Sequence, residues 1–359
     1  MAAPDRPPPA QRRARARPAR GYWRTLLIGL TVVTALLLGA AALVALRTNR
    51  AISTIQQADP RRRPTAAAGG VAVDPLAPTL PPLPDALKQP VNILLIGVDK
   101  RPNAEDGVRS DTLIVVHLDP QSKWASMLSI PRDSVVNIPH IGRSKINAAY
   151  ANGYASAEEI YGAGTAPDAG GAALAAETVE RFLGVRVDYT AQVDFHGFAA
   201  LVDSVGGVVV DAPRPVLDAE YPTEDYGVER IYIPAGLQVM DGRTALIYAR
   251  SRHTSTDFDR SARQQAVLRA LLDQVRARGL LENVATLPQW AEVLEQNIRT
   301  TLPIGDLGMI NGLASLAREL KSDRIIQLSI NPTDVAIDQE DGSDIYWNQA
   351  DLAALVARW

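Results

Sequence analysis

Apolar and polar residues change their arrangement several times along this chain, and the first change is the sharpest. Residues 1–24 consist mainly of proline, alanine and arginine, with too few apolar side chains to bury a core. The stretch from Leu26 to Leu46 then has no charged residue over 21 positions. At a rise of about 1.5 Å per residue, a helix of this length covers about 30 Å, the thickness of a bilayer core. The pattern predicts one transmembrane helix over residues 25–46.

The arginines around this span predict its orientation. Seven arginines precede it, and cytoplasmic flanks of membrane helices are enriched in such cations, so residues 1–24 are expected to be a cytoplasmic tail. Arg47, Arg50 and residues 61–63 follow the span and act against this orientation. A cleavable signal peptide has a shorter apolar region, of about 7–15 residues. We therefore expect a single-pass anchor in the cell membrane, with the rest of the chain extracytoplasmic.

Proline is frequent after the span, at positions 64, 75, 78, 81, 82, 84 and 90. Proline-rich segments favour extended backbone without regular hydrogen bonds. Residues 47–90 are therefore predicted to be an extracytoplasmic tether, and the folded domain is predicted to occupy residues 91–359.

Within the folded domain, apolar runs of strand length alternate with helical patterns. The runs are continuous rather than alternating, which indicates strands covered on both faces. Strands are expected at residues 92–98, 112–118, 124–130, 189–193, 208–210 and 325–330. Helices are expected at residues 172–183, 195–205, 242–249, 259–278, 306–320 and 348–359. This mixture is typical of a layered α/β sandwich.

Composition and charge exclude several classes of function. Cysteine is absent, so there is neither a disulfide framework nor a cysteine-ligated zinc site, and the four histidines show no metal-ligand spacing. Residues 1–50 contain nine arginines and one aspartate, which leaves 28 basic and 39 acidic residues, a formal charge of −11, for residues 51–359. Nucleic-acid binding requires a positive surface, so the folded part is not expected to bind nucleic acid.

Two aspartates mark a first candidate site. Asp99 closes one predicted strand, and Asp111 opens the next. Ligands of α/β proteins gather at strand ends and loops, and carboxylates together with substrate phosphates are the usual ligands of Mg²⁺. On spacing alone, the alternative is a pair of loop aspartates that cap turns.

A second group of charged residues follows the third predicted strand. Pro131 ends the strand, and Arg132 comes next, with a planar guanidinium that matches phosphate oxygens. Lys145 adds another cation nearby. The alternatives are an Arg132–Asp133 surface pair, which contributes little to stability, and a solvated lysine.

The third group is the densest, with four arginines between residues 250 and 263. Asp257, Arg260 and Gln264 are spaced by three and four residues, so in a helix they share one face near the N-terminus, where backbone N–H groups favour anions. Arg250 and Arg252 share a side only if the chain there is extended. The alternative is a basic surface helix with internal ion pairs.

Sequence motifs of conventional catalysis are absent: there is no G-x-S-x-G elbow, no phosphate-binding G-x-x-x-x-G-K-[ST] loop and no H-E-x-x-H. Arginines and aspartates without an evident nucleophile fit phosphoryl-type transfer, in which positioning and charge neutralisation supply most of the catalysis.

Taken together, these segments resemble the LytR-CpsA-Psr family of cell-wall glycopolymer transferases. The resemblance covers roughly residues 91–280 and is carried, in order, by Asn92–Asp99, Arg109–Thr112, Ser129–Asp133, Lys145–Tyr150, Val202–Val208, Tyr248–Arg252 and Asp257–Gln264. It implies a three-layer α/β/α sandwich with a mixed central sheet, preceded by one transmembrane helix. Thr256, where the family usually has glycine, and Asp259, at a position that is often small, depart from the pattern.

The resemblance also implies an activity and a set of roles. Such proteins move a phosphoglycan from a polyprenyl-pyrophosphate carrier to a peptidoglycan hydroxyl, with Mg²⁺ or Mn²⁺ as cofactor. The implied metal ligands are Asp99 and Asp111; the implied catalytic residues are Arg132, Arg250, Arg252, Asp257 and Arg260; the implied substrate-binding residues are Arg109, Lys145, Arg263 and Gln264. The partners are then the lipid-linked glycan, peptidoglycan and the membrane. Alternatives are a pyrophosphatase acting on the same lipid, a membrane-bound transcriptional attenuator and a non-catalytic lipid-binding module.

Overall fold

The structure is a computed structural model. It describes residues 54–62, 88–100, 108–223, 227–251, 256–278, 297–304 and 324–359, with single residues between 295 and 319. The predicted tail, the predicted transmembrane helix and Arg252 lie outside the described residues, as does most of the predicted helix 306–320. Among the described helices, none combines the length and apolarity needed to cross a bilayer.

A six-stranded sheet forms the centre of the domain. Its strand order is β11 (Ile298–Thr300), β6 (Tyr189–Asp194), β1 (Val91–Asp99), β2 (Arg109–Asp119), β3 (Trp124–Ile130) and β12 (Ile325–Ser329). The pairs β1–β6 and β3–β12 are parallel, whereas β1–β2, β2–β3 and β6–β11 are antiparallel. The expected α/β fold with a mixed central sheet is therefore confirmed.

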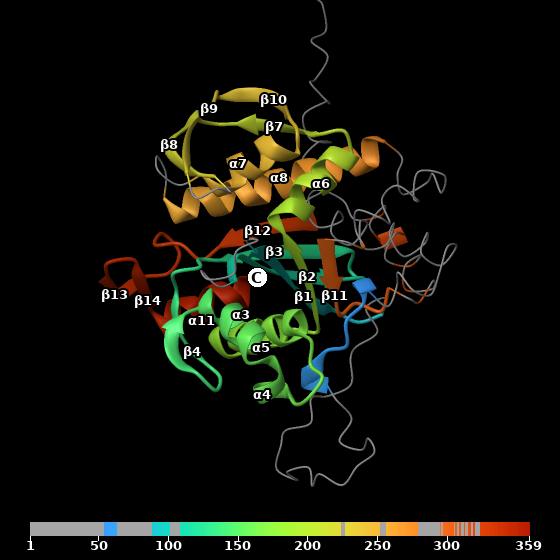
Figure 1. Cartoon of the computed structure of the whole chain (residues 1–359), viewed down its shortest axis with the longest axis vertical. Helices are drawn as coiled ribbons and strands as arrows, with labels where there is room; N and C mark the ends of the chain where they lie inside the picture. Colours follow the sequence, from blue (N-terminus) through green and yellow to red (C-terminus); the bar gives the residue numbers. More distant parts are fainter. Residues whose placement is uncertain are drawn as a thin grey trace, which may run out of the picture.

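Helices lie on both faces of this sheet (Figure 1). One face carries α3 (Ala148–Ala155), α4 (Ala157–Tyr161), α5 (Pro167–Leu183) and α11 (Gln349–Arg358). The other carries α6 (Phe195–Ser204), α7 (Gly242–Arg250) and α8 (Asp257–Ala277). Successive residues of a strand point to opposite faces, so in β1 Leu94 and Ile96 join the core under α5, while Val91 and Ile93 join the core under α8. This double burial explains the continuous apolar runs.

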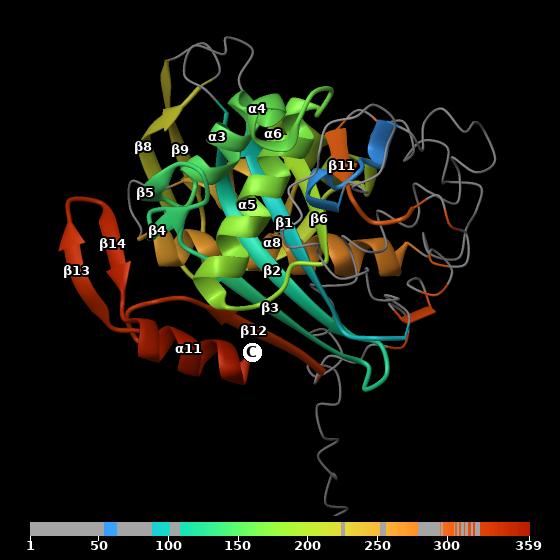
Figure 2. The same cartoon turned by 90° about the horizontal axis from the view of Figure 1, so that it is seen from below.

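Four two-stranded ribbons surround the layers, and the hydrophobic pattern predicted only part of one of them. They are β4 (Val135–Ile138) with β5 (Gly142–Lys145), β7 (Val208–Ala212) with β10 (Gly236–Met240), β8 (Val216–Pro222) with β9 (Val228–Ile233), and β13 (Ile337–Asp341) with β14 (Asp344–Trp347). The β13–β14 hairpin lies beside β4 and β5 (Figure 2). Short strands with mixed polarity give little periodic signal, which is why they were not anticipated.

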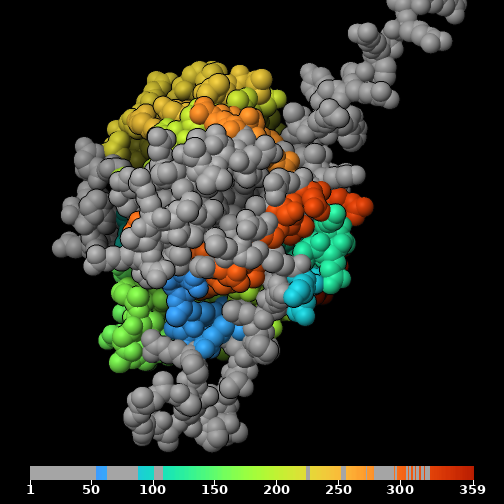
Figure 3. Space-filling view, turned by 90° about the vertical axis from the view of Figure 1, so that its right-hand side faces the viewer, coloured from blue at the N-terminus to red at the C-terminus, as the bar shows by residue number. Residues whose placement is uncertain are grey.

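The predicted start of the folded domain at Val91 does not hold, because residues 54–62 pack onto the domain as an edge strap. Ile55 is fully buried in the core, and the backbone N–H of Gln57 donates to the carbonyl of Thr300 on the edge strand β11 at 2.7 Å. The Arg61 guanidinium lies 2.7 Å from Asp59 and 3.3 Å from Glu180 of α5. The edge strap ends in a short helix, η1 (Pro60–Arg62). This helix lies against the side of the domain that α4 and α5 form (blue and green in Figure 3). Charged and apolar contacts therefore fix a segment that was predicted to belong to the extended tether.

Candidate functional site

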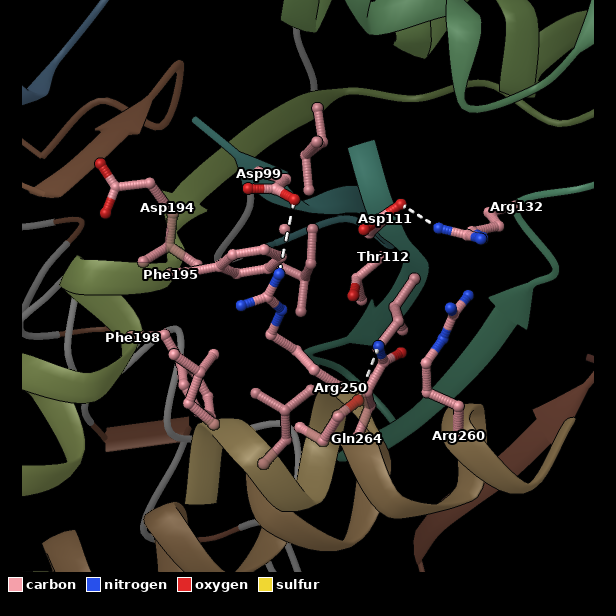
Figure 4. A pocket seen from close by; sticks show the side chains of 18 of the residues that line it. Asp99, Asp111, Thr112, Arg132, Asp194, Phe195, Phe198, Arg250, Arg260 and Gln264 are labelled. Carbon is pink, nitrogen blue, oxygen red and sulfur yellow. Dashed lines mark hydrogen bonds and ion pairs between the residues drawn. The ribbon is translucent and has the colours of Figure 1, made fainter. Parts of the chain in front are cut away.

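A cavity of about 860 Å³ lies between the sheet and helices α6, α7 and α8 (Figure 4). A large part of its wall is apolar and is made by Leu95, Ile114, Ala191, Val193, Phe195, Phe198, Leu201, Leu246, Leu268, Leu271 and Ile298. Most of its charged residues come from chain segments that meet at one end of the sheet: the end of β1, the start of β2, the turn after β3, the end of α7 and the start of α8. The cavity thus combines an apolar interior with a polar end.

Asp99 and Asp111 both line this polar end, on the neighbouring strands β1 and β2. The two strands are antiparallel with a register shift at Gly97 and Val98, so the last residues of β1 lie beside the first residues of β2. Each carboxylate faces an arginine: Asp99 Oδ2 is 3.5 Å from Arg250 Nη2, and Asp111 Oδ1 is 2.6 Å from Arg132 Nη1. Asp99 and Asp111, the metal ligands that the resemblance implies, therefore line the same end of the cavity.

Arg132 projects from a tight turn after β3. The turn is closed by the Ser134 N–H, which donates to the Pro131 carbonyl at 3.1 Å. The guanidinium lies within ion-pair distance of Asp111, Asp133 and Asp257. Burial disfavours its charged form, but the surrounding carboxylates outweigh burial and raise the pKa of Arg132. The guanidinium is therefore a fixed positive charge held in the cavity wall.

Arg250, the last residue of α7, is held between aromatic rings. Its guanidinium carbon lies 3.9 Å from the ring centre of Phe195 and 5.7 Å from that of Tyr221. Stacking of this kind orients a cation without neutralising it. Arg250 thus presents its N–H groups beside Asp99 at the polar end of the cavity.

The start of α8 supplies a carboxylate, a cation and an amide. Asp257, Arg260 and Gln264 all line the cavity, which confirms the shared helix face expected from their spacing. Arg260 Nη2 is 2.6 Å from Asp257 Oδ1. Burial raises the pKa of Asp257 despite Arg260 and Arg132, and burial lowers the pKa of Arg260. Both groups are therefore held in a less hydrated environment than ordinary surface charges.

The two departures from the family pattern begin this helix. Thr256 is the N-cap: its hydroxyl accepts from the Asp259 N–H at 3.2 Å, and Asp259 Oδ2 accepts from the Thr256 N–H at 3.0 Å. Such a capping box satisfies two backbone donors that the helix itself leaves free. Hydrogen bonds from Thr256 lower the pKa of Asp259, which keeps the cap charged. Thr256 and Asp259 therefore fix where α8 starts.

Two residues expected to bind substrate lie away from the cavity. The Arg263 guanidinium is buried and donates to the carbonyls of Tyr248, at 2.8 Å, and Ser251, so it ties α8 to the end of α7. Lys145 Nζ lies 2.9 Å from Asp133 and 3.2 Å from Asp344 and does not line the cavity wall. Both side chains are therefore positioned to hold elements around the site.

Arg109 does line the cavity, from an exposed position at the first residue of β2. Further residues of the wall were not anticipated: Asp133, Asp194, Phe195, Asp218, Tyr221 and Pro222. Only the position of Asp133 beside Arg132 gave a sequence signal for its place in the site. The others come from the end of β6, the start of α6 and the strand β8, whose approach to the cavity depends on packing.

The charges of the wall indicate what it accepts. The described lining residues include six aspartates and four arginines, a formal charge of −2. In the part of the chain that the structure describes, no group of three or more His, Asp or Glu side chains is arranged to hold a metal ion by itself. Mg²⁺ sites built from one or two carboxylates are completed by substrate phosphates and water. The carboxylates of Asp99 and Asp111, both in the cavity wall, fit that donor set.

Comparison with known proteins identifies the family of this chain. The family model described as the LytR_cpsA_psr family matches residues 44–357. The polyisoprenyl-teichoic acid–peptidoglycan teichoic acid transferase TagV of Bacillus subtilis is 34% identical over 256 residues, which cover 70% of this chain and 59% of TagV. TagT of the same organism is 31% identical over 248 residues, 68% of this chain and 69% of TagT. The chain thus spans about three fifths of the length of TagV.

Solved structures extend the likeness to three dimensions. The crystal structure of B. subtilis TagV matches with a TM-score of 0.56 and 30% identity, over 76% of this chain and 96% of that one. TagT with bound octaprenyl pyrophosphate lipid matches with a TM-score of 0.52 and 26% identity, over 76% and 90%. With the family model matching most of its length, this chain belongs to the LytR_cpsA_psr family.

Proposed function

We propose that this protein transfers a phosphoglycan from a polyprenyl-pyrophosphate carrier to a hydroxyl of peptidoglycan. The observation that carries the proposal is the apolar cavity whose polar end gathers Arg132, Arg250 and Arg260 with Asp99 and Asp111. Apolar side chains suit a polyprenyl chain, and guanidinium groups suit the oxygens of a pyrophosphate. The names of the relatives TagV and TagT, and the octaprenyl pyrophosphate bound to TagT, support this assignment.

In the proposed reaction, an oxygen of the peptidoglycan hydroxyl attacks the phosphorus that bears the glycan. A new phosphorus–oxygen bond forms, and the bond to the polyprenyl phosphate breaks, so that polyprenyl phosphate leaves with the bonding electron pair. Negative charge accumulates on the leaving group, where Arg132, Arg250 and Arg260 stabilise it. Arg252, which lies outside the described residues, is proposed to join them because it follows Arg250 by two positions.

The proton of the attacking hydroxyl is proposed to pass to Asp257. A carboxylate is a better general base when its pKa lies closer to the working pH, and burial raises the pKa of Asp257. Asp257 also lies 3.9 Å from Arg132 and 2.6 Å from Arg260. The proposed base is therefore next to the cations that receive the developing charge.

A divalent cation, Mg²⁺ or Mn²⁺, is proposed to bind to Asp99 and Asp111 together with the pyrophosphate. When bound, it neutralises part of the pyrophosphate charge. The formal charge of −2 on the described wall supports this proposal, because an anionic pyrophosphate adds further negative charge to the same end of the cavity. Arg109 and Gln264 line the cavity wall and are proposed to contact the substrate directly.

Location follows from the proposed substrate. We place the protein in the cell membrane, with residues 25–46 as its single span, residues 1–24 in the cytoplasm and the domain outside. This arrangement puts the cavity in the compartment that contains peptidoglycan, within reach of a lipid-linked substrate.

The test is transfer of a labelled phosphoglycan from its polyprenyl pyrophosphate to peptidoglycan by the full-length protein, with products separated into wall-linked and free glycan. An Arg250→Ala, Arg252→Ala double variant is expected to lose at least about a hundredfold in rate, since each charged contact contributes about 1.5–3 kcal/mol. Arg243→Ala, at an exposed position of the same helix, is the control and keeps full activity. Full transfer by the double variant would contradict the proposal, and release of free phosphoglycan alone would identify a hydrolase.

A further inference from the structure

The C-terminal hairpin β13–β14 contacts both segments that carry the proposed catalytic groups. Trp347, the last residue of β14, is 3% exposed. On one side its indole Nε1–H donates to the Ser134 hydroxyl at 2.8 Å. On the other side its ring lies edge-to-face with Phe258, with ring centres 6.1 Å apart. Ser134 follows Arg132 and Asp133 in the turn after β3, and Phe258 follows Asp257 at the start of α8.

The hydrogen bond from Trp347 ends a short chain of bonds across the turn that carries Arg132. The Ser134 hydroxyl accepts from Trp347 and donates to the Pro131 carbonyl at 2.7 Å. The backbone of β14 adds a second connection, because the Ile345 N–H donates to the Asp133 carbonyl at 3.1 Å. The turn is therefore attached to β14 through both a side chain and the backbone.

The contact with Phe258 connects Trp347 to the start of α8, which carries Asp257 and Arg260. Phe258 packs against the core under α5, next to Asp257 in the first turn of α8. Arg132 and Asp257 come from different elements, and the distance between Arg132 Nε and Asp257 Oδ1 is 3.9 Å. That distance depends on how the turn after β3 is placed relative to the start of α8. Trp347 contacts both, with a hydrogen bond to one and a ring contact to the other.

We infer that Trp347 is a positioning residue, which holds the Arg132 turn and the first turn of α8 in the relative placement that pyrophosphate binding requires. It does not line the cavity, so it acts through Ser134 and Phe258. The inference rests on the proposed function, since it assumes that Arg132 and Arg260 bind a pyrophosphate. It also gives a role to the C-terminal hairpin, which begins 73 residues beyond Gln264, the end of the last motif of the family pattern.

The experiment measures binding of two probes to the full-length protein: geranylgeranyl pyrophosphate, and geranylgeraniol, which has the same apolar chain without the charge. Trp347→Phe keeps an aromatic ring but removes the N–H donor. We expect it to bind the pyrophosphate about tenfold more weakly, comparable to weakening one charged hydrogen bond, while its affinity for the alcohol stays within about twofold. Trp124→Phe is the matched control, because Trp124 lies at the opposite end of β3 from Arg132 and contacts the His117 ring.

A second variant tests the route through Ser134. Ser134→Ala removes the acceptor of the indole hydrogen bond, so it should weaken pyrophosphate binding at least as much as Trp347→Phe. The double variant should bind no more weakly than Ser134→Ala alone, because both changes break the same bond. If the two changes weaken pyrophosphate binding additively, Trp347 does not act through Ser134.

Two further outcomes separate the inference from the proposed function. Wild-type affinity of Trp347→Phe for geranylgeranyl pyrophosphate, or an equal loss for both probes, overturns the positioning role while the proposed function stands. If the wild-type protein itself binds the pyrophosphate no better than the alcohol, the proposed function fails, and the inference fails with it.

Discussion

Arg260 and Arg263 lie three residues apart on α8, and the structure assigns them opposite roles. Arg260 lines the cavity, whereas Arg263 is turned toward the end of α7. Replacing each by methionine removes the charge and keeps an unbranched side chain of similar length. The two variants should therefore separate pyrophosphate binding from stability.

The magnitude for Arg263→Met follows from its hydrogen bonds. Its guanidinium donates to the Tyr248 and Ser251 carbonyls, and each charged hydrogen bond contributes about 1.5–3 kcal/mol. Burial lowers the pKa of Arg263, so removing the cation recovers part of a desolvation penalty. We expect a net loss of about 2–4 kcal/mol in the free energy of unfolding. At about 2–4 °C per kcal/mol, the unfolding temperature falls by about 5–15 °C.

Arg260→Met should act on binding instead. Its guanidinium lies beside Asp257 in the cavity wall, and among the described residues its buried Nε has no hydrogen-bond partner, so the protein itself does not satisfy all of its N–H groups. Losing one charged contact weakens geranylgeranyl pyrophosphate binding by about 10- to 100-fold. The fall in unfolding temperature should be smaller than for Arg263→Met, because no backbone carbonyls lose their donor.

Thermal unfolding and titration calorimetry on both variants give the comparison. In Arg263→Met, affinity for geranylgeranyl pyrophosphate should stay within about threefold of wild type, since Arg250 is held separately by Phe195, Tyr221 and Asp99. The reasoning is refuted if Arg263→Met weakens binding as much as Arg260→Met while its unfolding temperature is unchanged. That result would return Arg263 to the substrate-binding role that the family resemblance implied.

On the acid side, the rate of transfer should fall at a pH above the pKa of an ordinary aspartate, because burial raises the pKa of Asp257. Asp257→Asn should abolish this acid limb of the pH–rate profile together with most of the activity. Persistence of the limb in that variant would exclude Asp257 as the base. Calorimetry on the wild-type protein should show that Mg²⁺ changes its affinity for geranylgeranyl pyrophosphate, and an Asp99→Asn, Asp111→Asn variant should lose this effect of Mg²⁺. An unchanged effect of Mg²⁺ in the variant would place the metal elsewhere. Arg61→Ala removes the closer of the two arginines that pair with the buried Asp59, while Arg62 remains at 3.4 Å, so it should cost up to about 3–5 kcal/mol of stability and speed proteolysis within residues 54–62. Wild-type unfolding of this variant would mean that the edge strap contributes nothing.

Sequence patterns predicted those features that depend on local geometry. The apolar runs of β1, β2 and β3 were recognisable because a strand buried on both faces needs apolar residues at every position. Asp257, Arg260 and Gln264 were placed on one face because the helical repeat alone fixes the angle between them. The order of the motifs indicated the family, which the family model confirms.

Packing decided the rest. The helical repeat does not tell which neighbour a face meets, so it did not show that Arg263 turns to the end of α7 while Arg260 turns to the cavity. The stacking of Arg250 on Phe195 joins residues 55 positions apart, and no local pattern records such a contact.

The same reason applies at the two ends of the domain. Residues 54–62 were predicted to belong to the tether, but the edge strand β11 and the carboxylate of Glu180 offered them partners from distant parts of the chain. Trp347 lies more than 200 residues from Ser134 and about 90 from Phe258, yet it contacts both. Sequence by itself thus determined which residue types carry the chemistry and their local spacing, whereas the tertiary structure decided which of them meet, because contacts between distant segments are set by how whole elements pack.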